Sequence, residues 1–158
     1  MQINTDPEDM LPHDHPARVK DRQINERFFL HDYVAMAIEP APGQTTITKQ
    51  DLTRLKQLVD RVQQQEGVFS EDILSLYSSD DIEGFPGGIK VDQFLRSPPE
   101  SQQVIDHLIE RVGDHPVLKG MILNEASGGI ALFVPVTDKQ YSYPVRQAAL
   151  SYWENQPE

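Results

Sequence analysis

One apolar stripe in the middle of the chain constrains the fold more than any other feature. Apolar residues recur there at intervals of three and four positions, which places them on one face of an α-helix. They are Leu52, Leu55, Leu58, Val59 and Val62. Thr48 followed by Asp51 is typical of a capping box with a shortened acid, and Gly67 favours a C-terminal stop. We therefore predict a helix over 49–66.

Strand-like runs lie on both sides of this helix. Residues 33–38 are predicted to form a buried strand, ended by Pro40, Pro42 and Gly43. Residues 68–69 and 73–77 are strand-like after the helix, so the order indicates a β-α-β unit with the helix as its crossover. Residues 78–88, rich in aspartate and glycine, are predicted to be a linker between subdomains.

A second unit of related content is predicted after the linker. Ser97 is expected to cap a helix that begins with two prolines and ends at Gly113. The apolar stripe of this helix comprises Val104, Ile105, Leu108, Ile109 and Val112. A β-hairpin is expected next, turning at 127–129 into a strand over 130–136. A final helix over 138–154 must hold Pro144 in its first turn or at a kink.

The expected fold class is α+β, with two tandem small ferredoxin-like (porter-type) βαβ subdomains. The expected organisation is a polar N-terminal segment over 1–27, with a short helix from about Pro16, and subdomains over 28–86 and 87–158. A βαβ unit needs a further strand after the last helix. The second subdomain is therefore expected to be incomplete at its C-terminus.

The bulk composition excludes several function classes. The 158 residues provide one domain or two small ones, and the formal charge of −11 argues against nucleic acid and anionic membrane surfaces as partners. The absence of cysteine excludes disulfides, thiolate zinc sites and cysteine nucleophiles. No apolar run approaches the roughly 20 residues that cross a bilayer, and the N-terminus lacks signal-peptide character.

Some polar clusters invite a chemical interpretation, and each has a simpler structural one. The sequence 13–15, His-Asp-His, resembles a metal site but is predicted to lie in a proline-flanked loop. His31 and Asp32 are adjacent, so a strand would point them to opposite faces. The acidic residues 80–84 lack the spacing of a calcium loop, because its twelfth position is Val91.

The second half of the chain holds two further clusters. Asp106 and Glu110 lie one helical turn apart beside His107, a pattern that is common on exposed helix faces. The C-terminal segment is aromatic and is interpreted either as the core face of the last helix or as an interface. Its aromatic residues are Tyr141, Tyr143, Tyr152 and Trp153. We expect no catalytic, cofactor-binding or metal-binding residues, and no enzymatic activity.

Several segments resemble, in the same order, a loop of exporters of the resistance-nodulation-division (RND) superfamily, above all its smaller MMPL-like members. These segments are 5–12, 15–19, 28–34, 66–68, 78–84 and 116–120. In those exporters the loop follows the first transmembrane helix and precedes the second.

The resemblance implies a periplasmic porter-type domain on the outer side of the bacterial inner membrane, within an integral membrane protein. The family couples proton entry to the export of lipids, drugs or other apolar compounds, using acids within membrane helices. The expected partners are the rest of the transporter, other copies or subunits of it, and lipid or apolar cargo. No functional residue is carried over to this chain. The alternatives are a free-standing α+β binding or scaffold domain and, less favoured, a small hydrolase that uses Asp106, Glu110 and His107.

Overall fold

The computed structural model describes residues 10–28, 30–124 and 126–155, so the start of the predicted N-terminal segment, residues 1–9, lies outside the described residues. Contacts divide the chain into two units, 1–31 and 32–158. The first unit contains helix α1 (Pro16–Phe28), in agreement with the short helix predicted there. The second unit contains β1 (Asp32–Ile38), α2 (Lys49–Val62), β2 (Asp80–Phe85), β3 (Gly88–Gln93), α3 (Gln102–Asp114), β4 (Leu123–Asn124), β5 (Gly129–Val136) and α4 (Ser142–Glu154), with short 3-10 turns η1 (Ser70–Asp72) and η2 (Lys139–Tyr141).

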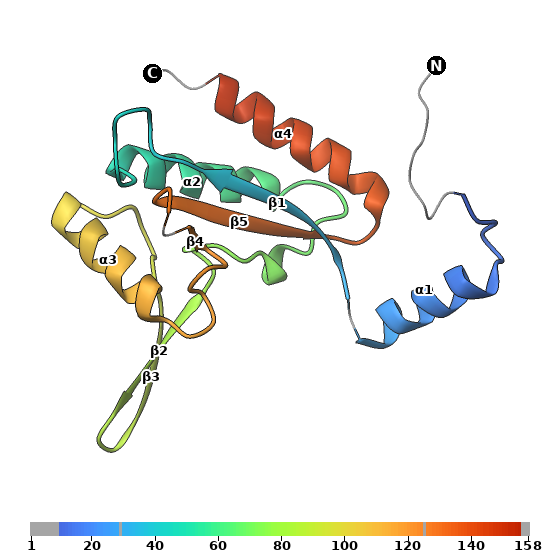
Figure 1. The fold of residues 1–158 in the computed structure, drawn as a ribbon, viewed down its shortest axis with the longest axis horizontal. Helices are drawn as coiled ribbons and strands as arrows, with labels where there is room; N and C mark the ends of the chain where they lie inside the picture. The colour runs from blue at the N-terminus through green and yellow to red at the C-terminus, as the bar shows by residue number, and fades with distance from the viewer. Residues whose placement is uncertain (1–9, 29, 125, 156–158) are drawn as a thin grey trace. The chain divides into compact units, whose positions relative to one another are not determined.

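Strand β5 is the centre of the main sheet, whose order is β1-β5-β4 (Figure 1). β1 pairs antiparallel with β5 along its whole length, from Asp32 opposite Val136 to Ile38 opposite Ile130. On the other side of β5 lie β4 and two antiparallel bridges, made by Val68 and Leu74. Because β1 and the segment 68–74 both run antiparallel to β5, they are parallel to each other. Helix α2 therefore connects two parallel segments, as in a crossover. The strands predicted at 68–69 and 73–77 do not form, because η1 interrupts the segment and leaves only single bridges at Val68 and Leu74.

The fold is α+β, as predicted, and its main sheet draws on both halves of the chain. β1 belongs to the predicted subdomain 28–86 and β5 to the predicted subdomain 87–158, yet the two strands pair directly. The predicted boundary between residues 86 and 87 falls in the turn that joins β2 to β3. Local sequence patterns suggest two units because they do not reveal the long-range pairing of β1 with β5.

Helix α2 covers one face of the sheet and has the stripe that its sequence predicts. Leu52, Leu55 and Val62 are completely buried, and α4 packs against both α2 and β1. The Thr48 amide donates to the Asp51 carboxylate at 2.8 Å, and the Asp51 amide donates to the Thr48 hydroxyl at 3.3 Å, which confirms the capping box. The helix ends at Val62 rather than at 66.

Strand β1 is only half buried, so the prediction of a buried strand was wrong on one face. Val34 and Ile38 belong to the core, whereas Ala35 and Ala37 are exposed and Tyr33 is 55% exposed. An antiparallel sheet with helices on one side needs apolar residues only at alternate positions. The small apolar alanines made the run look uniformly buried in the sequence.

The other two helix boundaries differ from prediction at their N-termini. The N-cap of α3 is Ser101, not Ser97, so both prolines precede the helix. Val104 is 51% exposed and lies off the buried stripe. α4 begins at Ser142 after the turn η2, which puts Pro144 in the first turn, where its missing amide would have no helical partner.

The predicted linker over 78–88 was wrong, because its residues form most of a β-hairpin. β2 and β3 pair antiparallel from Asp80 opposite Gln93 to Phe85 opposite Gly88. Asp81, expected in a solvated acidic loop, is buried and forms an ion pair with Arg111 of α3. A segment with the composition of a loop thus forms a strand, and its buried carboxylate is paired with an arginine that is distant in the sequence.

Candidate binding surfaces

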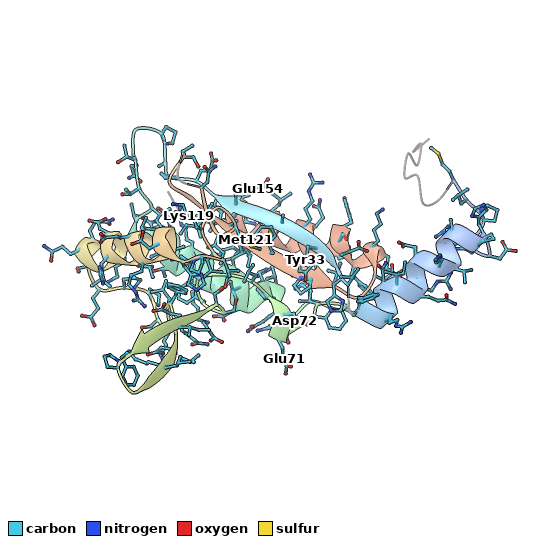
Figure 2. The ribbon with its side chains drawn as sticks, turned by 60° about the horizontal axis from the view of Figure 1, so that its bottom comes forward. Tyr33, Glu71, Asp72, Lys119, Met121 and Glu154 are labelled. Atoms are coloured by element: carbon cyan, nitrogen blue, oxygen red, sulfur yellow. The ribbon has the colours of Figure 1, made fainter. Side chains whose placement is uncertain are left out.

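Within the described part of the second unit, one side of the sheet is left accessible, opposite the side on which α2 and α4 pack. Tyr33, Ala35 and Ala37 of β1 point to this side, and the strand register places Ala35 opposite Phe133 and Ala37 opposite Ala131. We call these five residues the open sheet face. Figure 2, turned from Figure 1 so that the bottom comes forward, labels Tyr33 together with Met121 and Lys119 of the neighbouring segment. The open sheet face is apolar and partly accessible.

A depression of about 400 Å³ lies at one end of this face. Its floor includes the small residues Ala37, Gly129 and Ala131, and the segment from Lys119 to Met121 forms one side. Met121 is 45% exposed, and its flexible thioether suits contacts with irregular apolar groups. Glu39 adds a carboxylate to the lining. The depression therefore combines an apolar floor with two residues of opposite charge in its lining, Glu39 and Lys119.

Two other polar groups in the lining are engaged in the turn between β4 and β5. The Ser127 hydroxyl accepts a hydrogen bond from the Gly129 amide at 3.2 Å. The Asn124 side chain accepts one from the Ala126 amide at 3.0 Å. These bonds shape the hairpin that the sequence predicted at 127–129. The described residues that line the depression are therefore better suited to binding a ligand through apolar contacts than to catalysing a reaction.

The β2–β3 hairpin carries a second apolar surface. Ile82 lies directly opposite Val91, and Ile89 lies two positions along on the same face of the ribbon. These three residues, the hairpin ridge, are 59%, 59% and 70% exposed respectively. Figure 1 shows the hairpin extending away from the main sheet of its unit. Since a two-stranded ribbon is marginally stable in water, an exposed apolar ridge on it is typical of a contact surface.

The base of the hairpin is anchored to α3 by a compact polar and aromatic cluster. Asp81 and Arg111 form an ion pair, and the Arg111 guanidinium lies 5.5 Å from the centre of the Phe94 ring. Phe94 in turn meets the His115 ring edge-on at 5.6 Å. The Nδ1 atom of His115 accepts a hydrogen bond from the Leu118 amide at 3.1 Å. These groups fix the orientation of the hairpin, and local sequence patterns predict none of their contacts.

The histidine clusters near the N-terminus have local structural contacts. The Nδ1 atom of His15 accepts a hydrogen bond from the Ala17 amide at 3.2 Å, and the His13 carbonyl accepts one from Arg22. Asp32 is the first residue of β1, next to His31. Within the described part of the chain, no three His, Cys, Asp or Glu side chains are placed to hold a metal ion together.

The acidic residues of α3 lie on its exposed side. Asp106 accepts a hydrogen bond from the Gln102 side-chain amide at 3.1 Å. The Nδ1 atom of His107 lies 3.7 Å from a carboxylate oxygen of Glu110, and the two side chains are 70% and 75% exposed. The structure thus brings these residues together on an open helix surface, with no enclosed space around them that would strengthen acid–base chemistry.

Most of the C-terminal aromatic residues attach α4 to α2. The Tyr152 hydroxyl donates to the Gln57 side chain at 2.7 Å, and Arg54 lies 5.8 Å from the centre of the Trp153 ring. Burial raises the pKa of Tyr152, and nearby arginines partly oppose this. Tyr143, expected on the core face, is 67% exposed. The core face of α4 instead presents Val145 and Ala149.

Comparison of the chain with protein-family models, with curated proteins and with solved structures gives no match. Among the described residues, no helix combines the length and the apolar character needed to cross a membrane.

Proposed function

We propose that this chain is a periplasmic porter-type domain of a proton-driven RND-superfamily exporter, with no catalytic chemistry of its own. In this role it provides passage for lipid-like or apolar cargo and transmits conformational change to the rest of the transporter. The observation that carries the proposal is the sheet itself, which has helices on one side and an apolar, accessible face on the other. The ordered resemblance of its sequence segments to the exporter loop supports the same conclusion.

The order of the elements supports a porter-type architecture. β1, α2 and the segment 68–74 make a parallel pair with β5 between its members, and α4 follows β5. From this arrangement we infer a split βαβ unit. We propose that the ferredoxin-like unit is a single one, formed by residues 32–77 and 122–154, and that the β2–β3 hairpin and α3 are inserted into it.

The open sheet face supports the choice of an apolar cargo. Ala35, Ala37 and Ala131 leave space beside the larger Tyr33 and Phe133. Each 100 Å² of apolar cargo surface that leaves water there would contribute about 2.5 kcal/mol before the costs of association. Met121 and the charges of Glu39 and Lys119 border the same region, so a cargo with a small polar head is accommodated as well.

A binding titration tests this role. A fluorescent long-chain alkyl probe should bind the isolated chain, and Ala37→Glu should weaken the binding at least about tenfold by placing a charge on the apolar floor. Ala41→Glu changes another exposed alanine, which lies in a loop after β1; it is the matched control and should leave binding unchanged. Equal probe affinity in the two variants would remove the open sheet face from the proposal.

The parent gene provides the decisive test of the exporter assignment. Apolar segments of about 20 residues should be encoded directly before residue 1 and directly after residue 158. Polar flanking sequence or a stop codon at that position would refute the assignment.

The hairpin ridge favours a second candidate, a binding or scaffold domain. Ile82, Ile89 and Val91 present a continuous exposed apolar row. A scaffold that uses this row should form a stable oligomer or complex in solution, and Ile89→Glu should dissociate it. A chain that sediments as a monomer at all accessible concentrations and has no partner would argue against this candidate.

A further inference from the structure

The outer edge of β1 is an incomplete part of the main sheet. β1 pairs with β5 on one side, and no second strand pairs with it among the described residues. Strand edges expose backbone donors and acceptors that another extended chain can satisfy. The hydrogen bonds that β5 makes on the side away from β1 show which backbone amides and carbonyls of β1 point outward from the edge.

The odd-numbered residues of β5 direct their backbone groups away from β1. The Phe133 amide and carbonyl both bond to Leu74, and the Ala131 amide donates to the Ile122 carbonyl at 2.7 Å. Backbone groups alternate along a strand, so residues 130, 132, 134 and 136 point toward β1. Their partners in the register are the even-numbered residues of β1, from 32 to 38. The amides and carbonyls of Tyr33, Ala35 and Ala37 therefore point outward from the edge.

The side chains near this edge fit an added strand. Ala35 and Ala37 are small, so their side chains on the open sheet face do not obstruct a strand that is added beside β1. On the opposite side Met36 is only half buried, although Val34 and Ile38 on either side of it are buried. α4 packs against β1. An apolar residue from an added strand would complete the cover over Met36.

Charge determines what the ends of such a strand should carry. Asp32 begins β1 and Glu39 directly follows it, and both residues are exposed. The whole chain carries a formal charge of −11. Basic residues at both ends of the added segment would complement these carboxylates, whereas acidic ends would be repelled. In an antiparallel pair with a second copy of this chain, Asp32 of one copy would lie near Glu39 of the other, so like charges would meet.

We propose that the outer edge of β1 is a docking site for an extended segment of a partner polypeptide. The segment pairs antiparallel with β1, is apolar at alternate positions and carries Lys or Arg at both ends. Antiparallel pairing follows the rest of the sheet and is slightly more stable per residue than parallel pairing. This inference rests on the sheet geometry and does not depend on the proposed exporter role.

Amide hydrogen exchange followed by NMR tests the proposal on the intact chain. In the free protein the amides of Tyr33, Ala35 and Ala37 should exchange fast, while those of Val34 and Met36 should be protected by β5. The probe is a synthetic peptide as long as β1, with alternating Val and Thr and a Lys at each end. Its addition should slow exchange at the three outward amides by at least about tenfold.

Two matched peptides and one variant sharpen the result. A peptide that is N-methylated at the amides facing β1, and one with Glu in place of the terminal Lys residues, should both lose the effect. Ala35→Pro removes an outward amide and leaves the hydrogen bonds to β5, so it should abolish peptide binding. The peptide controls remain decisive if this variant does not fold.

Three outcomes would overturn the proposal. The first is protection of the outward amides in the free, dilute protein, which would mean that the chain covers its own edge. The second is protection that grows with protein concentration alone, which would identify a second copy as the occupant. The third is equal protection by the N-methylated and unmodified peptides.

Discussion

Removal of either partner of the ion pair between Asp81 and Arg111 should destabilise the domain, but by different amounts. The Asp81 side chain is 10% exposed and that of Arg111 is 34% exposed. Arg111→Met keeps the alkyl contact but leaves a carboxylate buried without its cation, which costs about 3 kcal/mol or more. Loss of the contact with the Phe94 ring adds about 0.5 kcal/mol. Asp81→Asn leaves an arginine that still reaches water, so it should cost less, about 1–2 kcal/mol.

Urea denaturation measures these differences directly. With an m-value of about 2 kcal/mol per M, Arg111→Met should lower the urea midpoint by at least roughly 1.7 M, and Asp81→Asn by less than about 1 M. The double variant should be less destabilised than the sum of the two, because the second change removes the charge that the first left unpaired.

The same hairpin provides a matched control. Arg96 bonds to Asp92 at 2.7 Å, but its side chain is 75% exposed. Arg96→Met should therefore change the stability by less than about 0.5 kcal/mol. If Arg111→Met is as mild as Arg96→Met, the ion pair of Asp81 does not anchor the hairpin, and the reasoning fails.

Three further perturbations are expected to have defined effects. The buried Ser79 hydroxyl has no hydrogen-bond partner within residues 10–28, 30–124 and 126–155, so Ser79→Ala should leave the urea midpoint unchanged or raise it. Gly67 has a φ of +77°, and an added Cβ would lie 2.2 Å from the Tyr141 ring, so Gly67→Ala should cost at least about 2 kcal/mol in calorimetry, whereas no loss would contradict this close contact. Burial, assisted by the nearby Asp60 carboxylate, raises the pKa of Tyr77, whose hydroxyl donates to the Leu52 carbonyl at 2.8 Å. The unfolded phenol ionises near pH 10, so this contribution to stability is complete below that pH and should fall above it; Tyr77→Phe should flatten the alkaline loss, seen as urea midpoints at rising pH.

Local sequence signals were sufficient for several elements of the fold. Thr48 and Asp51 lie within one turn of each other, so their capping box forms from residues adjacent in the chain. The stripe from Leu52 to Val62 needs only helical periodicity to be recognised. The turn at 127–129 is likewise local. In each case the physical cause lies within a few residues.

The candidate surfaces depended on contacts between distant residues. Ile82 and Val91 looked like parts of a linker and its flank until the hairpin placed them opposite each other. Ala35 and Ala37 looked buried because their apolarity indicates burial but not which side of a sheet a helix covers. Asp81 looked solvated because Arg111 lies on another element.

The amino-acid sequence by itself determined the α+β class, the amphipathic helix α2, the hairpin into β5 and the acidic, cysteine-free surface chemistry. These depend on periodicity, turn residues and charge, which are properties of short segments or of composition. Only the tertiary structure decided that β1 and β5 share one sheet, that the hairpin ridge is exposed, and that Tyr33, Ala35 and Ala37 present an outward strand edge. Pairing between strands about a hundred residues apart depends on global packing, which no local pattern encodes.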